Sequence, residues 1–210
     1  LFNLRRMLMN KSFIIKIILL CLVTIKVSAT EKVILFGDSL MAGYGLPKEE
    51  HLSVVLQKSL EIEGYNIEIV NGSVSGSTSA GGLNIAEWTL SENNIDLMIL
   101  CLGANDMLRG INPKETKNNL EEIIKIAKSK NIKIIIAGMI APTSYGYSYK
   151  KSFDKIFSDL SKKYKLQLIP FLLEGVAQKP EFNLSDGMHP NDQGTIIIGN
   201  TLKKAILENL

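Results

Sequence analysis

Short apolar runs alternate with longer amphipathic stretches five times between residues 30 and 210. The runs are rich in Ile, Val and Leu, as buried parallel strands are, and they cover residues 32–36, 66–70, 97–102, 132–137 and 166–169. Strand–helix alternation of this kind predicts a parallel sheet with helices on both faces. We therefore expect an α/β domain with three layers, α/β/α, around a five-stranded parallel sheet. An ordinary composition, 46% hydrophobic and 21% charged, excludes a disordered or collagen-like chain.

The stretches between the runs carry helix signals. Asn112, Pro113 and Glu115 form a capping-box pattern with a proline at the first helical position. Apolar residues then recur at helical spacing from Leu120 onwards. Other helices are expected over about 53–63, 80–91 and 149–164, and a terminal helix is expected to be capped by Asn191.

Residues 1–29 differ from the rest of the chain and have the three parts of a secretory signal peptide. Basic residues precede an apolar run at 17–25, and Val27, Ser28 and Ala29 resemble a small-residue cleavage site. The run is too short to span a bilayer comfortably. We expect a cleaved signal peptide over 1–29, one domain over 30–210, and a periplasmic or secreted bacterial protein. The alternative is an uncleaved N-terminal anchor.

The positive charge of the chain lies in this leader. Five of the 24 Lys and Arg residues and none of the 21 Asp and Glu residues fall in 1–29, so the remainder has 19 against 21 and a net charge of −2. A nucleic-acid-binding domain would normally keep a basic face, so no nucleic-acid partner is expected. Cys101 lies in an apolar run and is expected to be a buried, unreactive core residue.

Polar and glycine-rich segments follow the first three predicted strands. They are Gly37-Asp38-Ser39-Leu40, residues 71–77, and Gly103-Ala104-Asn105-Asp106. In a flavodoxin-like strand order, 2-1-3-4-5, these three strands are neighbours, and parallel sheets bind ligands at the carboxyl ends of their strands. The segments would then bring a hydroxyl, a glycine-rich backbone and a side-chain amide to one place.

A serine needs a base to take its proton before it can act as a nucleophile. Of the two histidines, His51 lies beside Glu49 and Glu50 and is expected to be a solvated surface residue. His189 lies in a loop before the terminal helix, three residues after Asp186. One turn can bring that carboxylate to the imidazole, where it would fix the tautomer and stabilise the imidazolium.

An oxyanion would need hydrogen-bond donors, which the Ser39 N–H, the Gly76 N–H and the Asn105 amide can supply. Taken singly, each residue also has a purely structural explanation. Ser39 can be a helix cap, Gly76 can permit a turn, and Asn105 can close an Asx turn. No complete phosphate-binding glycine motif is present.

The combination resembles the SGNH (GDSL-type) hydrolases. Gly-Asp-Ser-Leu, a glycine in the second loop, Gly-x-Asn-Asp and Asp-x-x-His occur in that order, from about residue 32 to residue 206. Further strings make the chain most similar to the secreted bacterial thioesterase I/lysophospholipase-type esterases: GDSLMAGYGLP (37–47), NGSVSGSTSAGG (71–82), LGANDMLRG (102–110), IAPTSYG (140–146) and DGMHPN (186–191).

The resemblance implies that Ser39 is the nucleophile, His189 the base and Asp186 its orienter. Ser39, Gly76 and Asn105 would form the oxyanion hole, and residues 107–111 would be a mobile loop over the acyl site. The sequence departs from the family where Ser77 replaces a frequent Asp and Met107 a frequent Gly. Apolar residues of the loops are expected to line an acyl groove: Met107, Leu108, Ile111, Ile140 and Pro142.

The expected function is a serine esterase, thioesterase and lysophospholipase that hydrolyses small acyl esters and thioesters. No metal or organic cofactor is implied, because no cluster of Cys, His and carboxylates has ligand spacing. No stable membrane insertion is expected after leader cleavage, and a monomer is expected. The alternatives are a carbohydrate O-acetyl esterase on the same scaffold and a non-catalytic, membrane-anchored binding protein.

Overall fold

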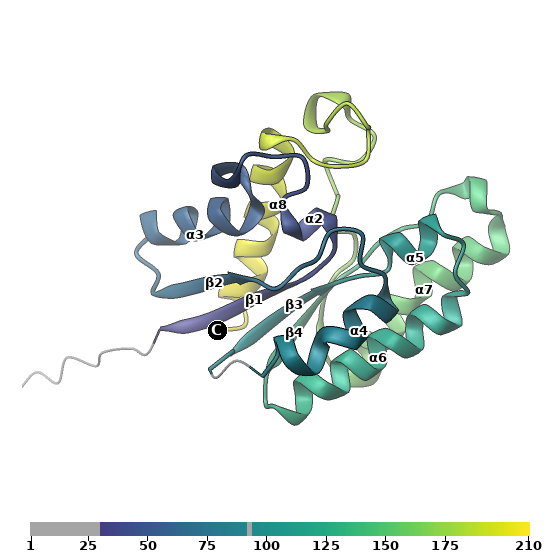
Figure 1. Cartoon of the computed structure of the whole chain (residues 1–210), viewed down its shortest axis with the longest axis horizontal. Helices are drawn as coiled ribbons and strands as arrows, with labels where there is room; N and C mark the ends of the chain where they lie inside the picture. The colour runs from purple at the N-terminus through teal and green to yellow at the C-terminus, as the bar shows by residue number, and fades with distance from the viewer. Residues whose placement is uncertain (1–29, 92–93) are drawn as a thin grey trace, which may run out of the picture.

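The structure is a computed structural model that describes residues 30–91 and 94–210 (Figure 1). The predicted signal peptide over 1–29 lies outside the described residues. The described part holds a five-stranded sheet with strand order β2-β1-β3-β4-β5, in which every pairing is parallel. The strands are β1 (Glu31–Gly37), β2 (Ile67–Asn71), β3 (Leu97–Cys101), β4 (Lys133–Ala137) and β5 (Gln167–Ile169). The flavodoxin-like order expected from the sequence is confirmed.

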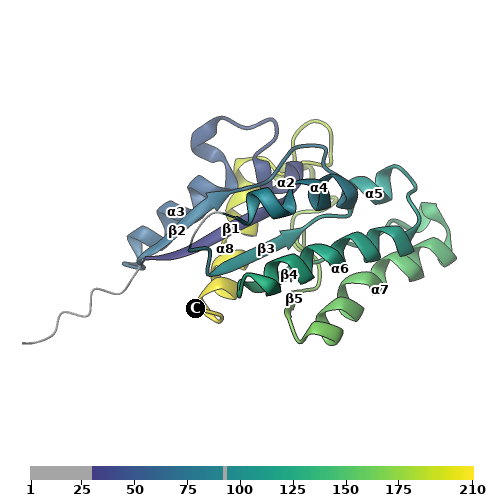
Figure 2. The same ribbon diagram turned by 60° about the horizontal axis from the view of Figure 1, so that its bottom comes forward.

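Helices cover both faces of this sheet. In Figures 1 and 2, α3 (Leu52–Ile62) and α8 (Asp192–Leu207) lie on one side, and they pack against each other. The other side carries α4 (Ser79–Thr89), α6 (Pro113–Ser129) and α7 (Tyr147–Tyr164). The three-layer α/β/α prediction is therefore confirmed. Within the described part of the chain, no helix is long and apolar enough to cross a membrane.

The predicted caps are present. The Asn112 side chain accepts from the Lys114 N–H, with Pro113 opening α6, and the Asn191 side chain accepts from the Gly194 N–H at the start of α8. Two short helices were not expected from the sequence: α2 (Ser39–Ala42) and α5 (Ala104–Leu108). Both follow central strands, and each is too short for an apolar periodicity to be visible.

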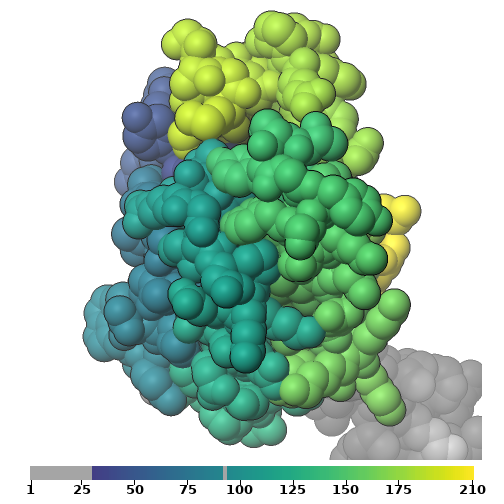
Figure 3. All heavy atoms as spheres, turned by 90° about the vertical axis from the view of Figure 1, so that its right-hand side faces the viewer, coloured from purple at the N-terminus to yellow at the C-terminus, as the bar shows by residue number. Residues whose placement is uncertain are grey.

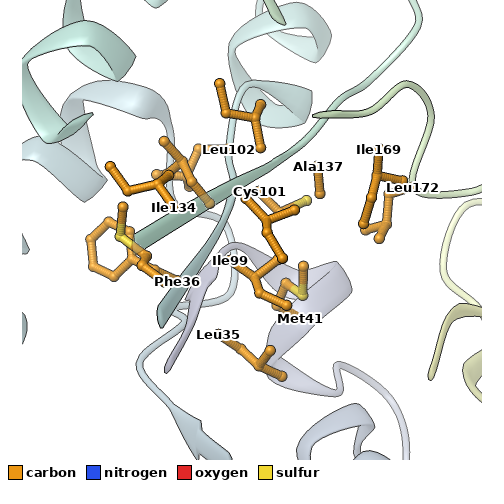
Figure 4. Packing of buried hydrophobic residues seen from close by; sticks show 14 of the residues in the cluster. Leu35, Phe36, Met41, Ile99, Cys101, Leu102, Ile134, Ala137, Ile169 and Leu172 are labelled. Carbon is orange, nitrogen blue, oxygen red and sulfur yellow. The ribbon is translucent and has the colours of Figure 1, made fainter. Parts of the chain in front are cut away.

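The core lies on both faces of β1 and β3, the two strands at the middle of the sheet. All five residues of β3 are buried, and so are the last five of β1. Figure 4 shows Leu35, Phe36, Ile99 and Cys101 among buried side chains of the neighbouring strands, such as Ile134 and Ile169, and of α2, such as Met41. Cys101 is fully buried, as expected. A fully buried aliphatic side chain contributes roughly 1.5–3 kcal/mol, so this packing fixes the strand ends from which the polar loops begin.

Candidate active site

Ser39 is the first residue of α2 and is separated from the carboxyl end of β1 by Asp38 alone. The ends of β1 and β3 approach each other closely here: a Cβ added at Gly37 would lie 2.6 Å from the Cys101 carbonyl oxygen. Asp38 is the N-cap of α2, where its Oδ1 accepts from the Leu40 N–H at 3.1 Å. The sequence therefore places the hydroxyl at the start of a helix, at the centre of the sheet edge.

His189 lies beside this hydroxyl. Its Nε2 is 2.9 Å from Ser39 Oγ, and its Nδ1 is 2.6 Å from Asp186 Oδ2. The loop before α8 carries both residues to the end of the sheet where β1 finishes. Figure 3 shows the yellow-green atoms of this region at the same end of the molecule as the blue and purple atoms that follow β1. The structure thus brings together the three residues that the sequence indicated for the triad.

The Asp186 carboxylate is held in place by its own loop. Oδ1 accepts from the backbone N–H groups of Met188 and His189, at 2.9 and 3.0 Å. Partial burial alone would raise the pKa of Asp186, but these two hydrogen bonds and the contact with the His189 ring outweigh it and lower the pKa to about 2. Asp186 is therefore a charged acceptor throughout the neutral range.

An aromatic ring covers one side of the histidine. The centroid of the Tyr44 ring lies 4.5 Å from that of His189, with an angle of 39° between the ring planes. Tyr44 follows Gly43, which has a positive φ of 84°. A Cβ at Gly43 would meet the ring of His51 at 2.4 Å, so glycine is needed here for space as well as for conformation.

The expectation that His51 is a solvated surface residue is wrong. Its ring packs against Gly43, and its Nε2 lies 3.1 Å from the Leu46 carbonyl oxygen. His51 is half-buried and directly precedes α3. It therefore supports the turn that carries Tyr44, a role with no local sequence signal because its partners, Gly43 and Leu46, lie eight and five positions earlier.

The end of β3 meets this site through Asn105, on the first turn of α5. Asn105 Nδ2 donates to Asp38 Oδ2 at 3.3 Å and to the Ser77 carbonyl oxygen at 3.1 Å. The three loops that follow β1, β2 and β3 are thereby joined by one side-chain amide. Burial raises the pKa of Asp38 to about 6, although the hydrogen bonds from Leu40 and Asn105 oppose the rise.

A second buried carboxylate, Asp106, binds the first residue of α4. It accepts from the backbone N–H of Ser79 at 2.7 Å, from the Ser79 hydroxyl, and from the Thr116 hydroxyl at 3.1 Å. Asn119 donates to the same serine hydroxyl at 3.0 Å. Asp106, a residue of α5, therefore connects the start of α4 with α6.

The three candidate oxyanion donors differ in whether they already donate a hydrogen bond within the protein. Gly76 has a positive φ of 77° and lies on an exposed turn. Among the described residues, the backbone N–H groups of Ser39 and Gly76 donate to no protein acceptor. Both amide hydrogens of Asn105, in contrast, have an acceptor.

The predicted acyl-groove residues are placed differently from one another. Leu108 and Ile140 are exposed, at 52% and 42%, and Pro142 is exposed as well. Met107 is only 7% exposed and belongs to the core. Ile111 is half-buried, and its carbonyl accepts from the Tyr149 hydroxyl. The first two positions of the expected loop over residues 107–111 form the end of α5.

Sequence reasoning gave no part in the site to four residues that contact the triad or support its loops in the structure: Asp38, Tyr44, His51 and Asp106. Asp38 and Asp106 belong to the Gly-Asp-Ser-Leu and Gly-x-Asn-Asp blocks, which offered a signal for them. For Tyr44, the only signal in the sequence was its position five residues after Ser39.

Comparison with known proteins identifies the relatives of this chain. Residues 35–195 match the GDSL-like Lipase/Acylhydrolase family. An arylesterase of Vibrio mimicus is 35% identical over 182 residues, which are 87% of this chain and 91% of that protein. The thioesterase 1/protease 1/lysophospholipase L1 of Escherichia coli K12 is 30% identical over 187 residues, which are 89% of this chain and 88% of that protein.

A solved structure agrees with these relatives. The psychrotrophic esterase EstA from Pseudoalteromonas sp., in a structure inhibited by monoethylphosphonate, matches with a TM-score of 0.81 and 30% identity. The match covers 85% of this chain and 97% of the esterase.

Proposed function

The chain belongs to the GDSL-like lipase/acylhydrolase family and is an ester hydrolase, and on this basis we propose that it cleaves acyl esters and thioesters through an acyl-enzyme on Ser39. The observation that carries the proposal is the continuous contact from Ser39 Oγ through the His189 ring to Asp186. A hydroxyl, a base and an orienting carboxylate in this order are the parts of a serine-hydrolase triad.

In the first step, His189 Nε2 takes the proton of the Ser39 hydroxyl as the oxygen attacks the substrate carbonyl carbon. Asp186 accepts from Nδ1–H, which leaves Nε2 free as the base and stabilises the imidazolium. The tetrahedral intermediate then expels the alcohol or thiol, which receives the proton from His189. Water, activated by the same nitrogen, hydrolyses the acyl-enzyme and regenerates Ser39.

Negative charge develops on the carbonyl oxygen during both steps. The N–H groups of Ser39 and Gly76, which donate to no other described group, are suited to stabilise it. Asn105 would add a third donor from the opposite loop. It can do so if the oxyanion replaces, or shares a hydrogen with, one of its present acceptors.

Thioesters belong in the proposal because one relative is named thioesterase 1/protease 1/lysophospholipase L1. The substrates would be small acyl compounds. A periplasmic or secreted location is proposed from the leader alone: a basic segment, the apolar run at 17–25 and the small residues up to Ala29.

The test combines labelling with turnover. A fluorophosphonate probe should label the wild-type protein once per chain and abolish hydrolysis of p-nitrophenyl butyrate and butyryl-CoA. Ser39→Ala should not be labelled and should lose about 10⁵-fold or more in kcat. Ser129→Ala, which removes an exposed serine hydroxyl at the end of α6, is the control and should behave as wild type.

Two results would overturn the proposal. One is a wild-type protein that hydrolyses neither substrate and takes up no probe. The other is a folded Ser39→Ala variant that keeps a tenth of the wild-type turnover.

A further inference from the structure

The turn that presents the Gly76 N–H is weakly supported by its own residues. Val74, Ser75 and Gly76 are all exposed, and a Cβ at Gly76 would meet nothing within 4 Å. Within the turn, one hydrogen bond runs from the Ser77 N–H to the Val74 carbonyl. The positive φ of Gly76 adds no restraint, because glycine adopts both signs of φ readily.

Three side chains of the α5 region reach across to this segment instead. Asn105 donates to the Ser77 carbonyl at 3.1 Å, and Asp106 accepts from the Ser79 N–H at 2.7 Å. Arg109, the C-cap of α5, donates from Nη2 to the Gly76 carbonyl at 3.0 Å. Asn105 and Arg109 are four residues apart, a spacing that places side chains on the same face of a helix. Among the described residues, Arg109 is the one whose side chain binds Gly76 itself.

This contact bears on catalysis because an oxyanion hole works by preorganisation. A donor contributes most when it is already aimed at the place where charge will develop and needs no rearrangement during the reaction. A Gly76 residue free to rotate would lose that advantage. Holding its carbonyl fixes the peptide plane that follows Gly76 and so limits the rotations by which the N–H could turn away.

We propose that Arg109 is a positioning residue that holds Gly76 in the conformation in which its N–H can stabilise the oxyanion. The inference rests on the proposed function. It adds Arg109, which is neither a member of the triad nor an oxyanion donor. Arg109 lies between Leu108 and Gly110 in the segment expected to lie over the acyl group. The same contact therefore connects the acyl side of the site with the oxyanion side.

A different role for the same guanidinium would be to bind a phosphate group of the substrate. The structure favours positioning, because one of its nitrogens already donates to a carbonyl oxygen of the site. An uncharged substrate separates the two roles, since it offers no anion for Arg109 to bind.

The experiment measures kcat and KM with p-nitrophenyl butyrate for the wild type, Arg109→Ala and Arg109→Lys. Lys114→Ala is the control, because it removes an exposed positive charge only five residues away. Arg109→Ala should lower kcat about tenfold with KM within about twofold, less than the 10²–10³-fold cost of deleting an oxyanion donor. The kcat of Arg109→Lys should lie between those of the wild type and Arg109→Ala, because an ammonium group can donate a hydrogen bond but lacks the planar fork of the guanidinium.

Chemical rescue supplies the readout that a general structural defect would not give. Guanidinium ion at about 10–50 mM should restore part of the kcat of Arg109→Ala, and it should not raise that of the wild type or of Lys114→Ala. The inactivation rate by a phosphonate, whose adduct also places an oxyanion in the hole, should fall in parallel with kcat.

The outcomes separate the two proposals. An active wild type with an Arg109→Ala variant of equal kcat refutes the role of Arg109 and leaves the proposed function standing. A defect in KM alone, or one that appears only with butyryl-CoA or a lysophospholipid, assigns Arg109 to substrate binding and also refutes positioning. A wild type without esterase activity or probe labelling refutes the proposed function itself.

Discussion

The Asp38 carboxylate accepts a hydrogen bond from the Asn105 amide at 3.3 Å, across 67 residues of sequence. The other hydrogen of the amide goes to the Ser77 carbonyl at 3.1 Å. The bond to Asp38 is the longer of the two, so we expect it to be the one that yields when an oxyanion needs the amide. Asp38, which precedes the proposed nucleophile Ser39, would then keep the Asn105 amide oriented until the oxyanion forms.

Asn105→Ala should lower kcat by about 10²–10³-fold with little change in KM, the usual cost of one oxyanion donor. The amide contributes when negative charge develops, which occurs in the transition state and not in the bound substrate. Steady-state kinetics on p-nitrophenyl butyrate measure both constants. A variant defective in KM alone would make Asn105 a contact to the ground state.

Asp38 should make the folded protein less stable as pH rises. Its pKa is about 6 in the folded state against a usual 3.8, so between these values the folded state binds more protons than the unfolded state. Protonated Asp38 therefore stabilises the folded state fully below pH 4. As pH rises towards 6, the free energy of unfolding falls by up to about 3 kcal/mol. Asp38→Asn keeps an oxygen for the helix cap and removes the titration.

The measurement is the difference in unfolding free energy between wild type and Asp38→Asn from pH 4 to pH 8. The variant should gain relative to the wild type as pH rises through this window. A constant difference would show that Asp38 does not titrate there.

Much of this site was predictable from sequence because its parts come from strand ends. The apolar runs fix the parallel sheet, and the sheet places the loops with Ser39, Gly76 and Asn105 at one edge. Asp186 and His189 were predictable as a pair because a single turn joins them. The contacts of Asp38 with Asn105, of Tyr44 with His189 and of Arg109 with Gly76 were not. Each joins segments that the sequence keeps apart, and none follows from a periodicity.

Asp186→Asn should lower kcat by up to about 10⁴-fold, because an amide can favour the wrong tautomer of His189. The low pKa of Asp186, about 2, also decides at which pH this residue can affect stability and activity. A group with a lowered pKa contributes stability above its unfolded value of 3.8, and this contribution is lost as pH falls through 2. Loss of activity between pH 7 and pH 5 therefore cannot come from Asp186.

A pH–rate profile of the wild type from pH 4 to pH 9, read beside that of Asp186→Asn, checks both points. Unchanged kcat at pH 8 in the variant would remove Asp186 from the mechanism.

The acyl preference should rise with chain length before levelling off. Each methylene that the substrate buries contributes roughly 0.8 kcal/mol to binding, about fourfold in kcat/KM. The gain ends where the acyl chain no longer contacts apolar side chains. The exposed Leu108 is the residue to truncate. Leu108→Ala should flatten the increase from acetyl to octanoyl p-nitrophenyl esters, and Ile62→Ala, which removes an exposed apolar group at the end of α3, should not.

A wild-type preference for acetyl over every longer chain would count against an acyl groove. An identical series for Leu108→Ala and the wild type would place the groove elsewhere.

The packing of α3 against α8 has a consequence for biosynthesis. Ser39 belongs to the first strand–helix unit, whereas Asp186 and His189 precede the last helix, which returns to cover the first. A chain that ends before α8 contains Ser39 and His189 but lacks the helix that packs on α3, so we expect it to hold the loop of His189 poorly. If Ser39 and His189 act as proposed, we expect hydrolytic activity to appear only after α8 has packed against α3, late in folding.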